Sequence, residues 1–244
     1  MFNLGVQLTY NLDMKKSFID AYAKLLTHYC GDINPGDKVL IRSTYLAEPL
    51  ILACQREVLL AGGVCEFDIT LPGVKKQRLD FSTDKQLAHP PILYAHAMNE
   101  FNVIVSINAP YDLFELDGID EKKLALVQSS IRPIKKIMMN RGATRDLRWV
   151  LCNYPTQSLA DAANMSLQEY TRFIIKGCFL NQADPKEEWQ SLSKKQQHWV
   201  DILNQGKVIQ FQSETTDISF KIDQRIWINS DGKRNMPSGE VFTS

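Results

Sequence analysis

The sequence lacks a net charge, because 28 Lys and Arg residues are balanced by 28 Asp and Glu residues. No long-range electrostatic field therefore steers the chain towards nucleic acid or an anionic membrane, and we expect neither as a partner. No stretch approaches the roughly 18 consecutive apolar residues of a transmembrane helix. The opening residues M-F-N-L-G-V-Q-L-T-Y also lack the basic segment and apolar run of a secretory signal. We therefore expect a cytoplasmic protein.

The five cysteines form an odd set, and no two of them are spaced as C-x-x-C. Most lie within apolar runs, where a free cysteine behaves as a small buried hydrophobic residue. We therefore expect a reducing compartment. At Cys152 and Cys178 we expect buried packing rather than a nucleophilic thiol, because the sequence shows no base beside them.

The common catalytic motifs are also missing. The four histidines lie far apart, no H-E-x-x-H occurs, and each histidine is more typical of a surface or helix face than of a metal ligand. No G-x-S-x-G supplies a serine nucleophile, and no glycine-rich loop supplies a phosphate site. The Arg42-Ser43-Thr44 turn could present helix N–H groups to an anion, but we favour ordinary helix capping by Ser43 or Thr44.

What is present is an alternation of strand and helix patterns. Apolar runs and period-2 patterns predict strands at residues 38–42, 64–70, 103–107 and 147–152. Helical spacing predicts helices at 13–30, 49–61, 91–99, 120–140, 158–163, 166–180 and 185–205. Asp13 is the expected cap of the first helix, and Pro133 is expected to kink the helix at 120–140. Residues 71–88 are expected to form a loop with only a short helix near 83–88. This order indicates an α/β domain with a parallel sheet and flanking helices.

The pattern changes near residue 206. Strands expected at 208–213, 217–222 and 225–229 have short connections, which favours an antiparallel meander. We therefore divide the chain into an α/β domain at 1–205 and the start of a second, antiparallel β-rich domain at 206–244. On the helix before this boundary, the spacing of Leu192, Trp199 and Leu203 predicts that Trp199 is largely buried.

The last twenty residues present a single carboxylate. Asp231-Gly232 and Ser238-Gly239 permit sharp turns, and Glu240 then opens a new extended run at 240–243. From these residues alone, a surface glutamate beside a turn is the favoured interpretation, and a carboxylate placed for chemistry at the mouth of a strand is the alternative.

The segment N-M-P-S-G-E-V-F-T-S at 235–244 resembles the N-M-P-x-G-E-V-F-T-x-P motif of the aminopeptidase T family of dinuclear metallo-aminopeptidases. Three other segments resemble the same family, so that the likeness covers essentially the whole chain. They are P-G-D-K-V-L-I-R with A-E-P-L within 35–50, R-W-V-L-C-N-Y-P-T-Q-S-L-A-D-A-A-N-M-S-L-Q-E-Y at 148–170, and D-P-K-E-E-W at 184–189.

The resemblance implies that Glu240 is a metal ligand and that the complete enzyme holds two divalent metal ions, which are zinc, cobalt, manganese or magnesium. It also implies peptide substrates and a homodimer. The other ligands of the family belong to a C-terminal half that lies beyond Ser244, so we expect this chain to be the N-terminal portion of the enzyme, inactive alone and without a tightly bound metal. No residue of this chain is assigned as a catalytic acid, base or nucleophile.

Two other functions stay open at this point. The chain could be a non-catalytic α/β binding or regulatory module. A nucleotide- or phosphate-binding α/β protein is disfavoured, because the glycine-rich loops are missing. The DNA after the Ser244 codon separates the enzyme from the module, since an enzyme fragment would continue in frame through further His, Glu and Asp residues.

Overall fold

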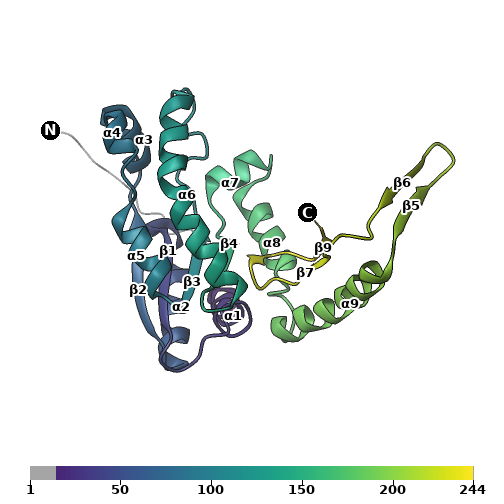
Figure 1. Cartoon of the computed structure of the whole chain (residues 1–244). Helices are drawn as coiled ribbons and strands as arrows, with labels where there is room; N and C mark the ends of the chain where they lie inside the picture. Colours follow the sequence, from purple (N-terminus) through teal and green to yellow (C-terminus); the bar gives the residue numbers. More distant parts are fainter. Residues whose placement is uncertain (1–14, 244) are drawn as a thin grey trace.

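The structure is a computed structural model that describes residues 15–243. Its centre is a five-stranded sheet in the order β2-β1-β3-β4-β8, in which every neighbouring pair is parallel. Figure 1 labels β1, β2, β3 and β4 of this sheet. The strands are β1 (Lys38–Thr44), β2 (Val64–Thr70), β3 (Val103–Asn108), β4 (Arg148–Asn153) and β8 (Asn235–Met236). The predicted parallel α/β fold is confirmed.

Alternation along the strands divides the core between the two faces of the sheet. Val39 and Ile41 of β1 pack in one apolar cluster, with α1 (Lys16–Leu25) and α2 (Glu48–Leu60). Leu40, between them, packs in a second cluster on the opposite face, with α5 (Ile92–Glu100) and α6 (Glu121–Ala143). Both faces are therefore covered, which is the usual condition of a parallel sheet.

Most of the predicted helix boundaries hold. Ser166 and Glu169 form the predicted capping box of α8 (Leu167–Gly177), and Asp184 caps α9 (Pro185–Gln205). α7 (Gln157–Ala162) begins where expected, and α6 continues through Pro133. Asp13, the predicted cap of the first helix, lies outside the described residues, and α1 is followed by a π-helical turn, η1 (Leu26–Cys30).

Two local predictions are wrong. Most of the loop expected at 71–88 is helical, with α3 (Val74–Phe81) before α4 (Asp84–Leu87). Ser43 and Thr44 do not cap η2 (Tyr45–Ala47) or α2. Their hydroxyls instead donate to the carbonyls of Ile107 and Ala109, at 2.9 and 2.6 Å, and so tie the end of β1 to the end of β3.

The buried face of α9 also differs from the prediction. Trp189 is 1% exposed, whereas Trp199, which we expected to be buried, is 59% exposed. The buried positions of α9 are Trp189, Gln196 and Val200. Position 199 is turned by about 100° from position 200 on a helix of 3.6 residues per turn, so it faces solvent when Val200 faces the core.

The C-terminal strands do not form the expected meander. β5 (Val208–Gln212) and β6 (Asp217–Lys221) make the predicted hairpin, but β7 (Ile228–Ser230) pairs with β9 (Glu240–Phe242) instead of β6. Between them, β8 joins the main sheet beside β4. The division at residue 205 therefore stays a prediction, and residues beyond it contribute directly to the parallel sheet.

The β5–β6 hairpin should be the first site of proteolysis. It extends away from the rest of the molecule, and its turn at 213–216 is exposed (Figure 1). We expect brief subtilisin treatment to cut there and the two fragments to remain together, because Met236 is 1% exposed and Tyr29 Oη donates to the carbonyl of Asp231 at 2.8 Å. Gel electrophoresis and size exclusion measure both outcomes. First cleavage within 228–236, or separation of the fragments, would contradict this arrangement.

Candidate metal centre

Glu240 is held on rigid backbone at the start of β9, as the sequence predicts. It lies opposite Ser230 of β7. The Gly239 N–H donates to the Ser230 carbonyl at 3.0 Å, and Gly239 has a φ of 114°, which a residue with a Cβ rarely adopts. The Gln196 Nε2 donates to the Glu240 carbonyl at 2.7 Å, so the buried side chain of α9 fixes this strand.

The Glu240 side chain is free to bind a ligand. It is exposed, and within residues 15–243 its carboxylate has no hydrogen bond or ion pair. It lines a cavity of about 620 Å³ that is bounded by α9, β7, β9 and the start of β4. A rigidly held, unpaired carboxylate is a hard oxygen ligand of the kind that divalent cations prefer.

The described residues do not form a metal centre by themselves. Among residues 15–243, no group of three or more His, Cys, Asp or Glu side chains is placed to hold a metal ion. Asp231 lines the same cavity, but its Oδ2 already accepts from Ser193 Oγ at 2.9 Å and from Lys233 Nζ at 2.7 Å. Glu240 thus fits a divalent ion as one ligand, while a catalytic site needs about three protein ligands.

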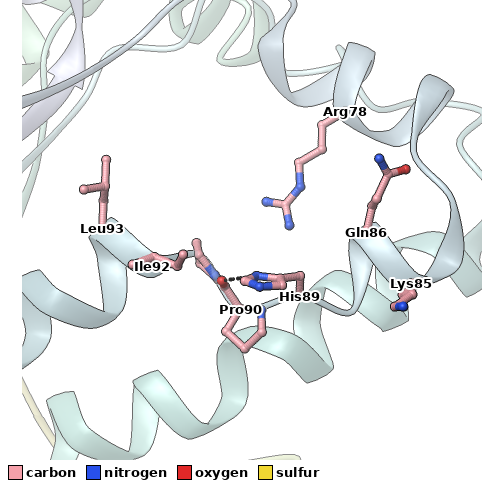
Figure 2. A pocket seen from close by; sticks show the side chains of 8 residues that line it. Arg78, Lys85, Gln86, His89, Pro90, Ile92 and Leu93 are labelled. Atoms are coloured by element: carbon pink, nitrogen blue, oxygen red, sulfur yellow. Dashed lines mark hydrogen bonds between the residues drawn. The ribbon is translucent and has the colours of Figure 1, made fainter.

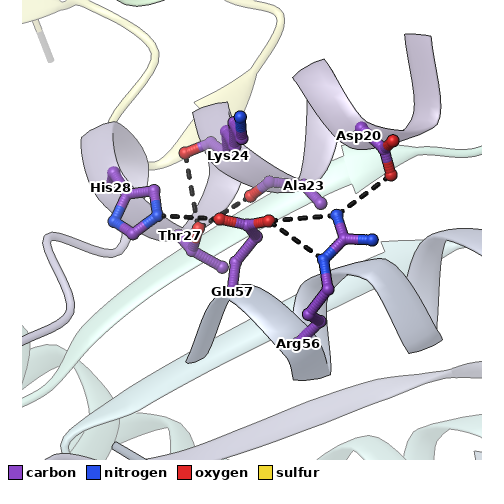
Figure 3. A network of polar contacts seen from close by, with 7 residues as sticks. All are labelled: Asp20, Ala23, Lys24, Thr27, His28, Arg56 and Glu57. Atoms are coloured by element: carbon purple, nitrogen blue, oxygen red, sulfur yellow. Dashed lines mark hydrogen bonds and ion pairs between the residues drawn. The ribbon is translucent and has the colours of Figure 1, made fainter. Parts of the chain in front are cut away.

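The histidines are not brought to Glu240. His89 Nδ1 lies 2.9 Å from the Pro90 carbonyl, in an open and mainly apolar cavity of about 610 Å³ that Arg78 and Gln86 also line (Figure 2). His28 lies on η1, where its Nε2 is 3.2 Å from Glu57 Oε2 (Figure 3). Neither side chain lines the cavity beside Glu240.

The Glu57 cluster has a structural function. Glu57 is 4% exposed, and its other carboxylate oxygen accepts from Arg56, which also bonds Asp20 of α1 at 3.0 Å (Figure 3). The cluster therefore joins α2 to α1 and to the π-helical turn that follows it. Because both Glu57 oxygens are occupied, this buried carboxylate is satisfied and is not a free ligand.

The thiols match the prediction of buried, unreactive packing. All five cysteines are free, and Cys65 alone among them is half-buried. Desolvation raises the pKa of Cys65 to about 11 and that of Cys178 to about 12. Burial also raises the pKa of Cys152 well above its usual range. These thiols stay protonated at neutral pH, so they are poor nucleophiles.

Among residues 15–243, none of the helices combines the length and the apolar composition that a membrane span requires.

The fold is a parallel α/β sheet with small antiparallel strand pairs at its C-terminal end. In one of these pairs, β7–β9, the unpaired Glu240 carboxylate lies beside a cavity. The family model described as Thermophilic metalloprotease (M29) matches residues 15–244. The chain belongs to this family of metalloproteases.

The structure comparison concerns the fold. Wild-type AmpT from Thermus thermophilus is similar in fold, with a TM-score of 0.76 and 18% sequence identity over 94% of this chain and 62% of that chain. This chain thus spans 62% of the length of the AmpT chain. The 2,5-dihydroxypyridine dioxygenase of Pseudomonas putida KT2440 is less similar, at a TM-score of 0.43 and 11% identity over 95% of this chain and 56% of that one. No curated protein sequence matches the chain.

Proposed function

We propose that this chain is the N-terminal portion of a metal-dependent aminopeptidase, which removes N-terminal amino acids from peptides at a two-metal site. Glu240 is one ligand of that site, and most of the others come from residues beyond 244. The observation that carries the proposal is the unpaired Glu240 carboxylate, which lines a cavity of about 620 Å³. Membership of the M29 family supports the metal and the hydrolytic reaction.

The chain's own contribution is to place one negative oxygen ligand and hold it still. Divalent ions, when bound, supply Lewis-acid polarisation of the scissile carbonyl and a strong nucleophile at neutral pH. Glu240 offsets part of their charge, and the bond from Gln196 Nε2 to the Glu240 carbonyl prevents β9 from moving away from α9. One carboxylate does not distinguish zinc, cobalt, manganese and magnesium, and all four stay within the proposal.

Our proposal for the complete protein also includes its setting. It is a cytoplasmic homodimer that acts on peptides and binds neither nucleic acid nor membrane. The balanced composition of 28 basic and 28 acidic residues supports the absence of nucleic-acid binding. The dimer rests on the family resemblance, and sedimentation of the complete protein tests it.

The alternatives are less well supported. A non-catalytic module does not need an unpaired carboxylate on a strand that Gln196 holds against α9. The family of the chain is also one of metalloproteases. A phosphate site at the Arg42-Ser43-Thr44 turn is disfavoured, because the Ser43 and Thr44 hydroxyls are bonded to strand carbonyls.

The 244-residue chain should be inactive by itself. We expect no release of N-terminal residues from short peptides after incubation with excess zinc, cobalt or manganese, because one exposed carboxylate binds a divalent ion only weakly. Amino-acid analysis of the reaction measures the outcome. Reproducible release that a chelator abolishes would show that the chain holds a complete site, and a stop codon directly after Ser244 would argue against missing ligands.

A further inference from the structure

The cavity beside Glu240 has the size and lining of a peptide site. Its volume of about 620 Å³ lies within the range of about 300 to 1,000 Å³ that is usual for small-ligand sites. Its walls come from α9, from β7 and the segment that follows it, and from the Arg145–Trp149 region between α6 and β4. Glu240 also lines this cavity, so a ligand bound there would reach the proposed metal site.

Within the described part of the chain, the lining carries one unpaired charge of each sign, on Arg234 and on Glu240. Four cationic side chains and two carboxylates line the cavity. Three of the cations are paired: Arg148 with Asp37 at 2.7 Å, Arg145 with Asp32 at 3.6 Å, and Lys233 with Asp231 at 2.7 Å. The fourth, Arg234, is exposed, and its guanidinium has no partner within residues 15–243. A planar guanidinium of this kind binds a carboxylate through two parallel hydrogen bonds.

A buried acceptor lies in the same wall. The Asn229 Nδ2 donates to the Ser193 carbonyl at 3.0 Å and lies 3.3 Å from the Gln197 Oε1. The Ser193 carbonyl can only accept, so the orientation of the Asn229 amide is determined. Its Oδ1 is then buried with no hydrogen-bond partner. A buried orphan acceptor costs free energy. This oxygen has no exposed surface, so a ligand in the cavity does not contact it in this arrangement of the wall.

We propose that this cavity binds short peptides that carry a carboxylate, with Arg234 holding the carboxylate. The free amine then points towards Glu240. This inference deepens the proposed function and rests on it for the nature of the ligand. A peptide advances by about 3.3 to 3.6 Å per residue, so a chain of two or three residues suits a cavity of this size.

Binding to the 244-residue chain in EDTA tests the inference without metal or catalysis. The probe is Ala-Ala-Ala, compared with the same peptide amidated at its C-terminus and with the amidated peptide Ala-Asp-Ala, each titrated by calorimetry. We expect the free acid to bind about tenfold or more tightly than the amide, because a charge-assisted bond is lost. If Ala-Asp-Ala amide binds as tightly as the free acid, the site recognises an acidic side chain. If it binds as weakly as the other amide, the site recognises the terminal carboxylate.

Two variants assign the effect to the cavity. Arg234→Gln should remove the preference for the free acid, and Arg234→Lys should restore part of it. Arg225→Gln is the matched control, because Arg225 is exposed in the same segment but does not line the cavity. Trp149 does line it, so its fluorescence should change with the free acid, and Trp149→Phe should abolish that signal while the calorimetric heat remains.

Equal affinity for the free acid and the amide would overturn the inference. So would the absence of saturable binding at about 10 mM peptide. It would also be overturned if Arg234→Gln and Arg225→Gln changed the affinity for the free acid equally. The outcome is separable from that of the proposed function. Binding of the free acid through Arg234, together with a complete protein that hydrolyses nothing, would refute only the aminopeptidase. Hydrolysis without the preference for acid over amide would refute only this subsite.

Discussion

Glu240→Gln should lower peptide hydrolysis by about a hundredfold or more in the chain extended by the coding sequence that follows Ser244. The amide keeps the shape of the side chain but removes the negative charge that offsets the metal ions. A hundredfold loss corresponds to about 3 kcal/mol of transition-state stabilisation. The measurements are kcat/KM on a short peptide and the metal content of the purified variant.

Glu214→Gln is the matched control for this substitution. Glu214 is exposed in the turn of the β5–β6 hairpin and does not line the cavity beside Glu240. We expect its rate and metal content to equal those of the unmodified chain. If Glu240→Gln also left both quantities unchanged, the assignment of Glu240 as a metal ligand would be wrong.

Trp189→Ala should destabilise the fold by about 3 to 5 kcal/mol, as is usual when a buried tryptophan is truncated. The side chain is 1% exposed, its Nε1 donates to the Cys178 carbonyl at 3.3 Å, and its ring packs edge-on against Phe179 at 5.3 Å. Gly232, with a φ of 90°, passes so close that a Cβ there would lie 3.0 Å from this ring. The indole therefore joins α9 to the segment before β8.

Trp199→Ala supplies the comparison on the same helix. Its side chain is 59% exposed, so we expect a change in unfolding free energy within about 1 kcal/mol. Urea unfolding of the two variants measures the difference. Equal destabilisation would mean that α9 packs through both faces, contrary to the burial described above.

The parallel sheet could be predicted because its signals are local. The apolar runs of β1 and β3, the turns around them, and the Ser166 and Asp184 caps each depend on a few neighbouring residues. The buried face of α9 could not be predicted in the same way. Apolar residues occur on two sides of this helix, and only the packed neighbours decide that Val200 is buried and Trp199 is not.

Strand pairing at the C-terminus depends on still more distant contacts. The sequence predicts strands near the positions of β7 and β9, but their pairing is stabilised by Gln196 of α9, which bonds the carbonyls of both Ser230 and Glu240. No pattern within 206–244 contains that information, so a meander with β6 was the simplest expectation. The low hydrophobicity of α3 likewise favours the prediction of a loop for its residues.

The candidate site was predicted in part. Its position on a strand after a turn follows from Ser238-Gly239, and its assignment as a ligand follows from the family motif around Glu240. The sequence did not indicate Asn229 or Arg234, because an orphan acceptor and an unpaired guanidinium become visible only when the surrounding contacts are known. Unsatisfied polar groups of this kind are therefore found from structure and not from motifs.

The most direct test of the aminopeptidase assignment uses the chain extended past Ser244 and two forms of one peptide, with a free and an acetylated N-terminus. Release of the first residue is measured with a divalent ion present, after chelation, and after the ion is added back. We expect release from the free peptide alone, its loss on chelation and its recovery with zinc, cobalt or manganese. Equal release from the acetylated peptide, or release that persists after chelation, would contradict a metal-dependent aminopeptidase.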